Sequence, residues 1–250
     1  MKIFYALLSS ELIKLRRTLA LWMLLIAPLI VLSLQCLLWL NQKDGIGYDA
    51  DLWIMFAMNI LSMWAIFMFP LFSALVVSLV YHYEHSTNGW QKLYTLPVPR
   101  WKIIAAKQTT SLLLLLASGG VLFIGIIAAG FFVGQVHPAI DMPQYIPYGE
   151  ILKKWSAVFA SSLLVVAVQN WISLRYSTLS VSIGAGIAGT FVALFASGWK
   201  YGHLYPWLMA LHALFDTNGR ETISLVAGMA GGMIVFIAMN IIESNREIAG

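Results

Sequence analysis

The hydrophobic residues of this chain are gathered into six long uncharged stretches, and the charged residues lie in the short segments between them. The pairs of charged residues that bound these stretches are Arg17 and Lys43, Asp51 and Glu84, Lys107 and Asp141, Lys154 and Arg175, Arg175 and Lys200, and Glu221 and Glu243. A helix needs about 20 predominantly apolar residues to cross a bilayer, and every stretch reaches that length. The pattern predicts an all-α polytopic membrane protein with six transmembrane helices.

The boundaries of the stretches place the six spans. We expect them at residues 18–40, within 52–83, and at 103–134, 155–174, 177–198 and 222–242. Pro70 is expected to bend the second span, because proline removes a backbone donor and crowds the preceding turn. The third span is longer than the bilayer core requires, so it must tilt or continue outside the membrane. Only Arg175, Tyr176 and a few neighbours link spans four and five, which predicts antiparallel neighbours.

The N-terminal segment, residues 1–17, has the pattern of an amphipathic helix rather than a span. Phe4, Leu8, Leu12 and Leu15 share one face at helical spacing. A helix of this kind lies in the headgroup layer, with its cations near anionic lipid. The alternative is a plain anchor that only fixes the topology.

A second unusual segment, residues 201–215, precedes the last span. It carries no charge, is too short to cross the membrane and is too apolar for an ordinary loop. Pro206 is expected to break it. We interpret it as a re-entrant or interfacial segment, with an amphipathic surface helix as the alternative.

Composition and charge exclude several classes of protein. The chain is 60% hydrophobic and 10% charged, whereas soluble domains are roughly 45–50% apolar and 25% charged. If both termini are cytoplasmic, the outer loops hold five of the 15 cations, namely Lys43, Lys153, Lys154, Lys200 and Arg220. This bias favours cytoplasmic termini. The single Cys36 excludes an internal disulfide. Nucleic acid is not expected as a partner, because the chain lacks a basic soluble domain.

Glycine-rich sequences within the spans indicate close helix packing. The run from Gly184 to Gly189 matches G-x-G-x-x-G, but it lies in the middle of a span rather than between a strand and a helix. Small residues allow transmembrane helices to approach closely. Gly228 and Gly232 in span six, and Gly130 and Gly134 in span three, have the same interpretation. Spans five and six are therefore expected to make the closest contacts.

No sequence signature of a catalytic or metal site is present. His82, Glu84 and His85 form H-x-E-H, which is not a zinc-protease spacing. The chain has no P-loop, no G-x-S-x-G and no pair of carboxylates within a span. We expect neither enzymatic activity nor a bound cofactor or metal in this chain. His203 and His212 are candidates for pH sensitivity, although interfacial histidines are more often only amphipathic.

The connection between spans two and three is the most specific part of the sequence. In residues 84–102 an acid closes the span, a turn follows at Asn88-Gly89, and a short helix ends at a proline-bounded stop. Trp90, Leu93, Tyr94 and Pro97 form one apolar stripe on that helix. Such a stripe suits either a soluble partner or the headgroup layer.

This connection resembles the coupling-helix loop of ABC type-2 permeases. The residues that carry the resemblance, and are implied to couple the chain to an ATPase, are Glu84, Gly89, Trp90, Leu93, Tyr94, Leu96, Pro97, Arg100 and Lys107, with Val98 in the stop motif. The N-terminal helix is similar to that family's connecting helix, with Glu11, Lys14, Arg16 and Arg17 as its candidate residues. The segment broken by Pro206 resembles the family's outer re-entrant helices, so one transmembrane domain covers residues 1–250.

The resemblance implies partners and a function. Such a permease works with two copies of an ATPase, which bind ATP and Mg²⁺, and with a second permease that is the same chain or a paralogue. The length and the aromatic loop are similar to the lantibiotic-immunity branch, which expels antimicrobial peptides from the bacterial cytoplasmic membrane. Export of drugs or lipids is the alternative. In this interpretation Glu84 holds the loop against the connecting helix through Arg16 or Arg17.

The expected path of an amphipathic substrate is largely apolar with a few neutral polar groups. Its candidate residues are Gln35, Asn59, Gln169, Asn170 and Asn240. An unpaired amide in lipid costs about 2–7 kcal/mol, so these side chains should face a cavity or bond between helices. Asp44, Asp49 and Asp51 in the first outer loop are candidates to attract cationic peptides. Two other functions compete, namely an intramembrane enzyme or haem-handling protein that uses the histidines and a sensor or scaffold that transports nothing.

Overall fold

The structure is a computed structural model that describes residues 2–16, 18–42, 52–137, 140, 142–215 and 219–245. These residues form helices and connecting turns, without a strand among them, which confirms the all-α prediction. The elements are α1 (Lys2–Leu15), α2 (Leu19–Leu40), α3 (Leu52–Met63), η1 (Trp64–Met68), α4 (Phe69–Ser86), α5 (Gly89–Tyr94), α6 (Arg100–Val136), α7 (Tyr148–Ser161), α8 (Leu163–Arg175), α9 (Leu179–Ala196), η2 (Gly202–Leu204), α10 (Pro206–His212) and α11 (Arg220–Ser244).

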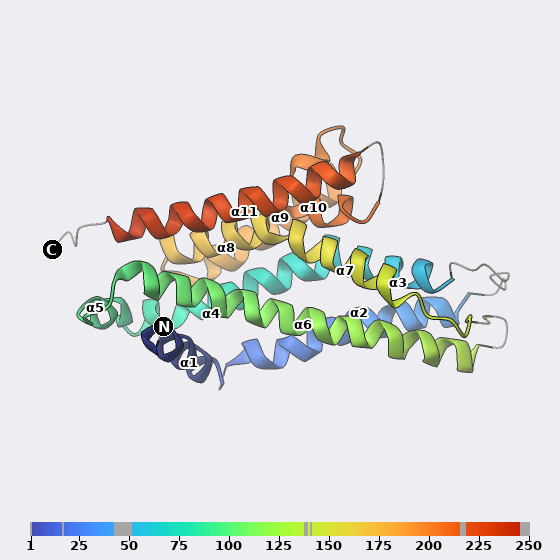
Figure 1. The fold of residues 1–250 in the computed structure, drawn as a ribbon, viewed down its shortest axis with the longest axis horizontal. Helices are drawn as coiled ribbons and strands as arrows, with labels where there is room; N and C mark the ends of the chain where they lie inside the picture. The colour runs from blue at the N-terminus through green and yellow to red at the C-terminus, as the bar shows by residue number, and fades with distance from the viewer. Residues whose placement is uncertain are drawn as a thin grey trace.

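Six helices in the described part of the chain are long and apolar enough to cross a membrane, which confirms the predicted number of spans. They are Leu19–Leu40, Leu52–Ser86, Arg100–Val136, Tyr148–Arg175, Leu179–Ala196 and Arg220–Ser244. They run side by side as one elongated bundle (Figure 1). The first residues of α1, the short α5 and the last turns of α11 lie at one end of it, which we call the α5 end.

The second span, α3 to α4, is the most enclosed. In its most apolar stretch of 18 residues, 61% of the residues are buried within the chain, compared with 17% in the corresponding stretch of α11. The sequence predicts a bend at Pro70, and the structure has a π-helical turn, η1, just before that residue. Proline has no N–H to offer the carbonyl of Ile66 four residues earlier, and π-turns commonly accommodate such breaks. α4 therefore runs from the centre of the bundle directly to α5.

The fourth span differs from its predicted boundaries. Its helix begins at Tyr148 rather than near residue 155, and Ser162 separates α7 from α8. The first turns of α7 contain Glu150, Lys153 and Lys154. The boundary predicted from charge was wrong because these residues form an amphipathic extension of the span, and a limit set by the nearest charged residue excludes them.

Glycines in spans five and six lie at close helix contacts, as predicted. A Cβ added to Gly228 of α11 would lie 2.2 Å from the carbonyl oxygen of Ser161, at the end of α7. One added to Gly186 of α9 would lie 2.2 Å from the Cβ of Ala74 in α4. Gly184, in contrast, faces open space. Span six therefore approaches span four at Gly228, and span five approaches span two at Gly186.

The segment before the last span forms two short helices, η2 and α10. The segment is interrupted at Tyr205, which is extended, and Pro206 begins α10, so the expected break at this proline is confirmed. The first position of a helix needs no N–H, and proline has the right φ for it. Trp207, Leu208 and Met209 are buried, so α10 packs into the bundle. Whether the segment is re-entrant or interfacial stays a prediction.

His203 and His212 lie close together in this segment, with ring centroids 6.4 Å apart and nearly perpendicular planes. Burial lowers the pKa of His212, and His203 and Arg220 nearby lower it further. The unfolded chain takes up a proton near pH 6.5, whereas the folded chain resists protonation, so stability should fall as the pH drops below that value.

His212→Gln should reduce this loss of stability. The measurement is the thermal unfolding midpoint of the purified protein at pH 7.5 and at pH 5.5. An equal drop between the two pH values in wild type and variant would contradict the assignment to His212.

Candidate functional site

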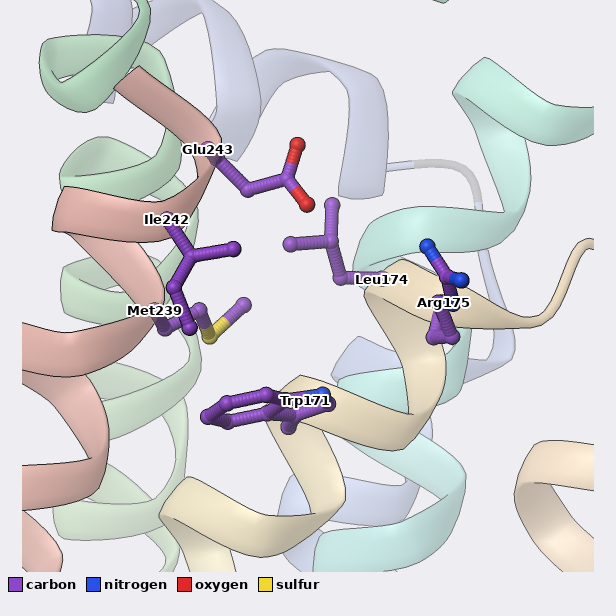
Figure 2. A pocket seen from close by; sticks show the side chains of 6 residues that line it. All are labelled: Trp171, Leu174, Arg175, Met239, Ile242 and Glu243. Carbon is purple, nitrogen blue, oxygen red and sulfur yellow. The ribbon is translucent and has the colours of Figure 1, made fainter. Parts of the chain in front are cut away.

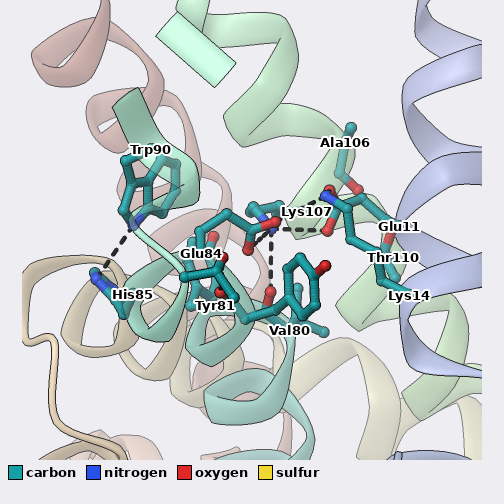
Figure 3. Close-up of polar contacts among 12 residues, drawn as sticks. Glu11, Lys14, Val80, Tyr81, Glu84, His85, Trp90, Ala106, Lys107 and Thr110 are labelled. Carbon is teal, nitrogen blue, oxygen red and sulfur yellow. Dashed lines mark hydrogen bonds and ion pairs between the residues drawn. The ribbon is translucent and has the colours of Figure 1, made fainter. Parts of the chain in front are cut away.

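Four charged side chains from three helices meet below α5 and form what we call the ion cluster (Figure 3). Lys107 Nζ of α6 lies 2.7 Å from Glu11 Oε2 of α1 and 2.5 Å from Glu84 Oε2 of α4. Lys14 Nζ of α1 lies 2.7 Å from the other oxygen of each carboxylate, Glu11 Oε1 and Glu84 Oε1. The formal charges of the two lysines and two glutamates cancel.

The ion cluster is almost entirely shielded from solvent. The side chain of Lys107 is 0% exposed and that of Glu84 is 2% exposed. Lys107 also donates to the carbonyl oxygen of Val80 at 3.1 Å, so its three N–H groups all have acceptors. Removing one member of a buried ion pair is costly, because the other member is left as an uncompensated charge. The cluster therefore ties α1, α4 and α6 together.

The spacing of residues on α1 brings Glu11 to the bundle. Phe4 and Leu8 are half-buried, and Glu11 and Leu15 are buried. The predicted apolar face needs a correction, because Leu12 is 39% exposed and Glu11 occupies the centre of the packed face. Positions 4, 8, 11 and 15 follow the helical repeat more closely than a set that includes position 12. Glu11 is an acid within an otherwise apolar face, and this feature of the sequence could have predicted that its side chain is buried and paired.

Lys14 joins the ion cluster from the rim of α1, with 24% of its side chain exposed. Burial alone would lower the pKa of Lys14, but its hydrogen bonds to Glu11 and Glu84 and their negative charge raise the pKa above its ordinary value. Glu84 pairs with Lys14 and Lys107 and not with Arg16, which is exposed, so that part of the predicted pairing was wrong. Arg17 lies outside the described residues, and its pairing with Glu84 stays a prediction.

α5 folds back over the last turn of α4, above Glu84. Asn88 has the left-handed φ of 52°, which asparagine tolerates better than most residues. A Cβ on Gly89 would lie 3.1 Å from the Cα of Glu84, which is tighter than an ordinary contact. The turn predicted at Asn88-Gly89 is confirmed, and glycine permits the close approach of α5 to α4.

Trp90 faces inward, toward the ion cluster. Its indole N–H donates to Nδ1 of His85 at 3.2 Å, and Nε2 of His85 lies 3.0 Å from the carbonyl oxygen of Ser173 in α8. His85 therefore accepts through Nδ1 and donates through Nε2. Trp90 also stacks on Tyr81, with ring centroids 6.3 Å apart, and Lys107 Nζ lies 5.7 Å from the Trp90 ring.

The exposed part of the loop is consequently narrower than the predicted stripe. Trp90 and Tyr94 pack against each other, with ring centroids 5.7 Å apart, and Arg100 lies 4.8 Å above the Tyr94 ring. Leu93 is half-buried, whereas Leu96 is 45% exposed and Pro97 is exposed. The interpretation that the whole stripe faces a partner needs correction, because its aromatic members are used within the chain.

The amides proposed for a substrate path lie in four helix contacts. Gln35 of α2 donates to the carbonyl oxygen of Asn59 in α3 at 3.3 Å, and the Asn59 side chain is exposed. Gln169 of α8 donates to the carbonyl oxygen of Ser182 in α9 at 2.7 Å. Two further bonds are those from Tyr81 Oη to Asn170 Oδ1 and from Asn240 Nδ2 to Gln108 Oε1. These bonds fit the alternative of interhelical contacts, and a role in transport stays a prediction.

Six apolar helices of spanning length, with the ion cluster below α5 among them, indicate a multi-pass membrane protein. The ABC-2 family transporter protein model matches residues 7–196, which is 190 of the 250 residues. The chain therefore belongs to the ABC-2 transporter family and is a transmembrane permease subunit, for which the family implies an ATPase partner. Comparisons with curated proteins and with solved structures gave no match.

Proposed function

We propose that this chain is the permease of an ATP-driven exporter and that the partner ATPase docks on the loop around α5. The complex contains two ATPase subunits, which bind ATP and Mg²⁺, and a second permease that is the same chain or a paralogue. The α5 end faces the cytoplasm of a bacterial cell, which agrees with the excess of lysine and arginine on that side.

The observation that carries the proposal is the position of the ion cluster directly below α5. Trp90 of α5 stacks on Tyr81 and lies above Lys107, which bonds to both carboxylates. A displacement of α5 is therefore passed to α1, α4 and α6 together. Since α4 is the second half of the most enclosed span, the movement reaches the centre of the bundle.

The proposed cargo is an amphipathic compound that enters from the membrane, with lantibiotic-like antimicrobial peptides as the first candidate. The similarity of the short chain and aromatic loop to immunity permeases supports this class. The spans offer mainly apolar surface together with a few amide groups, which suits such a substrate. Asp44, Asp49 and Asp51, proposed to attract cationic peptides, lie outside the described residues.

Leu96→Asp should lower substrate-stimulated ATPase activity of the reconstituted complex by about tenfold. The physical reason is that an exposed apolar anchor at the centre of a contact commonly contributes over 1 kcal/mol, and a buried carboxylate there adds a desolvation cost. Leu96 is 45% exposed, so the permease itself should fold normally.

Leu204→Asp is the matched control, because Leu204 is 51% exposed in η2, which lies between α9 and α10 and is far from α5 (Figure 1). This variant should retain wild-type stimulation. Full stimulation in Leu96→Asp, measured at equal amounts of assembled permease, would remove the docking role of the loop.

A further inference from the structure

A cavity of about 330 Å³ lies between α8 and α11 (Figure 2). Its walls are formed by Trp171, Leu174 and Arg175 from α8 and by Met239, Ile242 and Glu243 from α11. These residues belong to the last turns of both helices, at the α5 end of the bundle. In a membrane-embedded chain this is the level at which apolar surface gives way to headgroups and water.

The cavity adjoins α11, the span with the smallest buried share. Trp171 is 38% exposed and Ile242 is 50% exposed, and both contribute to the walls. Indole side chains are enriched at the membrane interface because one part of the ring system is apolar and the N–H is polar. A membrane lipid therefore reaches the cavity laterally, without passing through the bundle.

Two opposite charges stand in the walls of the same cavity. Glu243 extends from α11 toward α8, and Leu174 lies between its carboxylate and Arg175 (Figure 2). Glu243 is 9% exposed, whereas Arg175 is exposed. The Arg175 guanidinium matches the geometry of a phosphate, and a carboxylate is the natural acceptor for a primary ammonium.

We propose that this cavity binds a membrane phospholipid with an ethanolamine headgroup. The lipid phosphate pairs with Arg175, its ammonium donates to Glu243, and the beginning of its acyl chains lies against Leu174, Met239 and Ile242. A glycerol headgroup carries no ammonium group that could donate to Glu243, and a choline headgroup has no N–H to donate. The cavity thus selects phosphatidylethanolamine over phosphatidylglycerol and phosphatidylcholine, whatever compound the permease transports.

The test uses the purified full-length chain in nanodiscs that contain equal amounts of the three phospholipids. Native mass spectrometry then measures which lipids stay bound after the disc is removed. The wild type should retain phosphatidylethanolamine preferentially. Glu243→Gln should reduce that preference by about tenfold, the usual effect of losing a charge-assisted hydrogen bond. Glu221→Gln, a carboxylate at the other end of α11, is the matched control and should behave as wild type.

A second measurement does not depend on the folding of the Glu243 variant. Lipids with brominated chains quench nearby tryptophans, and the share due to Trp171 is the difference between wild type and Trp171→Phe. Brominated phosphatidylethanolamine should quench this share at a lower mole fraction than brominated phosphatidylglycerol or phosphatidylcholine. Equal quenching by all three lipids, or retention of another headgroup in preference, would overturn the proposal.

Discussion

Lys107→Met is expected to destabilise the protein by about 3–5 kcal/mol, because it leaves two carboxylates buried with one partly exposed lysine between them. Lys107 is fully buried and bonds to Glu11, Glu84 and the carbonyl oxygen of Val80. Methionine fills a similar volume, so the loss reflects charge rather than a cavity. The free energy of unfolding of the purified chain in detergent, measured by denaturant titration, gives the value directly.

Two further variants separate the effect of charge from a general effect of substitution. Lys153→Met changes an exposed lysine on α7 and should alter stability by no more than about 0.5 kcal/mol. Lys107→Met combined with Glu84→Gln should recover part of the lost stability, because one unpaired buried charge is removed. A loss below about 1 kcal/mol in Lys107→Met would show that the ion cluster does not hold the three helices together.

Gly228→Ala is expected to destabilise the protein by about 1–3 kcal/mol, because the added methyl group has no room. Its Cβ would lie 2.2 Å from the carbonyl oxygen and 2.6 Å from the Cα of Ser161. These are backbone atoms, so relief requires that α11 moves away from α7 rather than that a side chain changes its rotamer. The same denaturant titration measures the loss.

Gly184→Ala is the matched control for this substitution. Gly184 is also in the middle of a transmembrane helix, but a Cβ there meets open space. Alanine is the better helix former, so this variant should be neutral or more stable by up to about 1 kcal/mol. If the two variants lose stability equally, the loss would come from a general effect of the added methyl group in these helices and not from the close approach of α11.

Much of the fold could be predicted from the sequence because membrane spans depend on local composition. The six spans follow from the distances between charged residues, and the turn at Asn88-Gly89 follows from two adjacent residues. The start of the fourth span was missed since Glu150, Lys153 and Lys154 lie on the polar side of its first turns. A limit set by the nearest charge cannot separate an amphipathic extension from a loop.

The ion cluster was only half predictable. Glu84 and Lys107 were singled out through the resemblance, and Glu11 and Lys14 through the connecting helix. The pairing itself joins Glu11 to Lys107, which are 96 positions apart, and depends on how α1 docks against α6. The inward orientation of Trp90 also depends on tertiary contacts, because His85 and Tyr81 belong to another helix.

Photo-crosslinking from the loop in the assembled transporter tests most directly whether the ATPase docks on the loop around α5. Benzoylphenylalanine is placed at position 96 or, for comparison, at position 204, and the complex is irradiated in its native membrane. A product that joins the permease to its ATPase is expected from position 96, and none is expected from position 204. A product from position 204 alone, or failure of position 96 to reach the ATPase in an active complex, would contradict the claim that energy enters the bundle through α5.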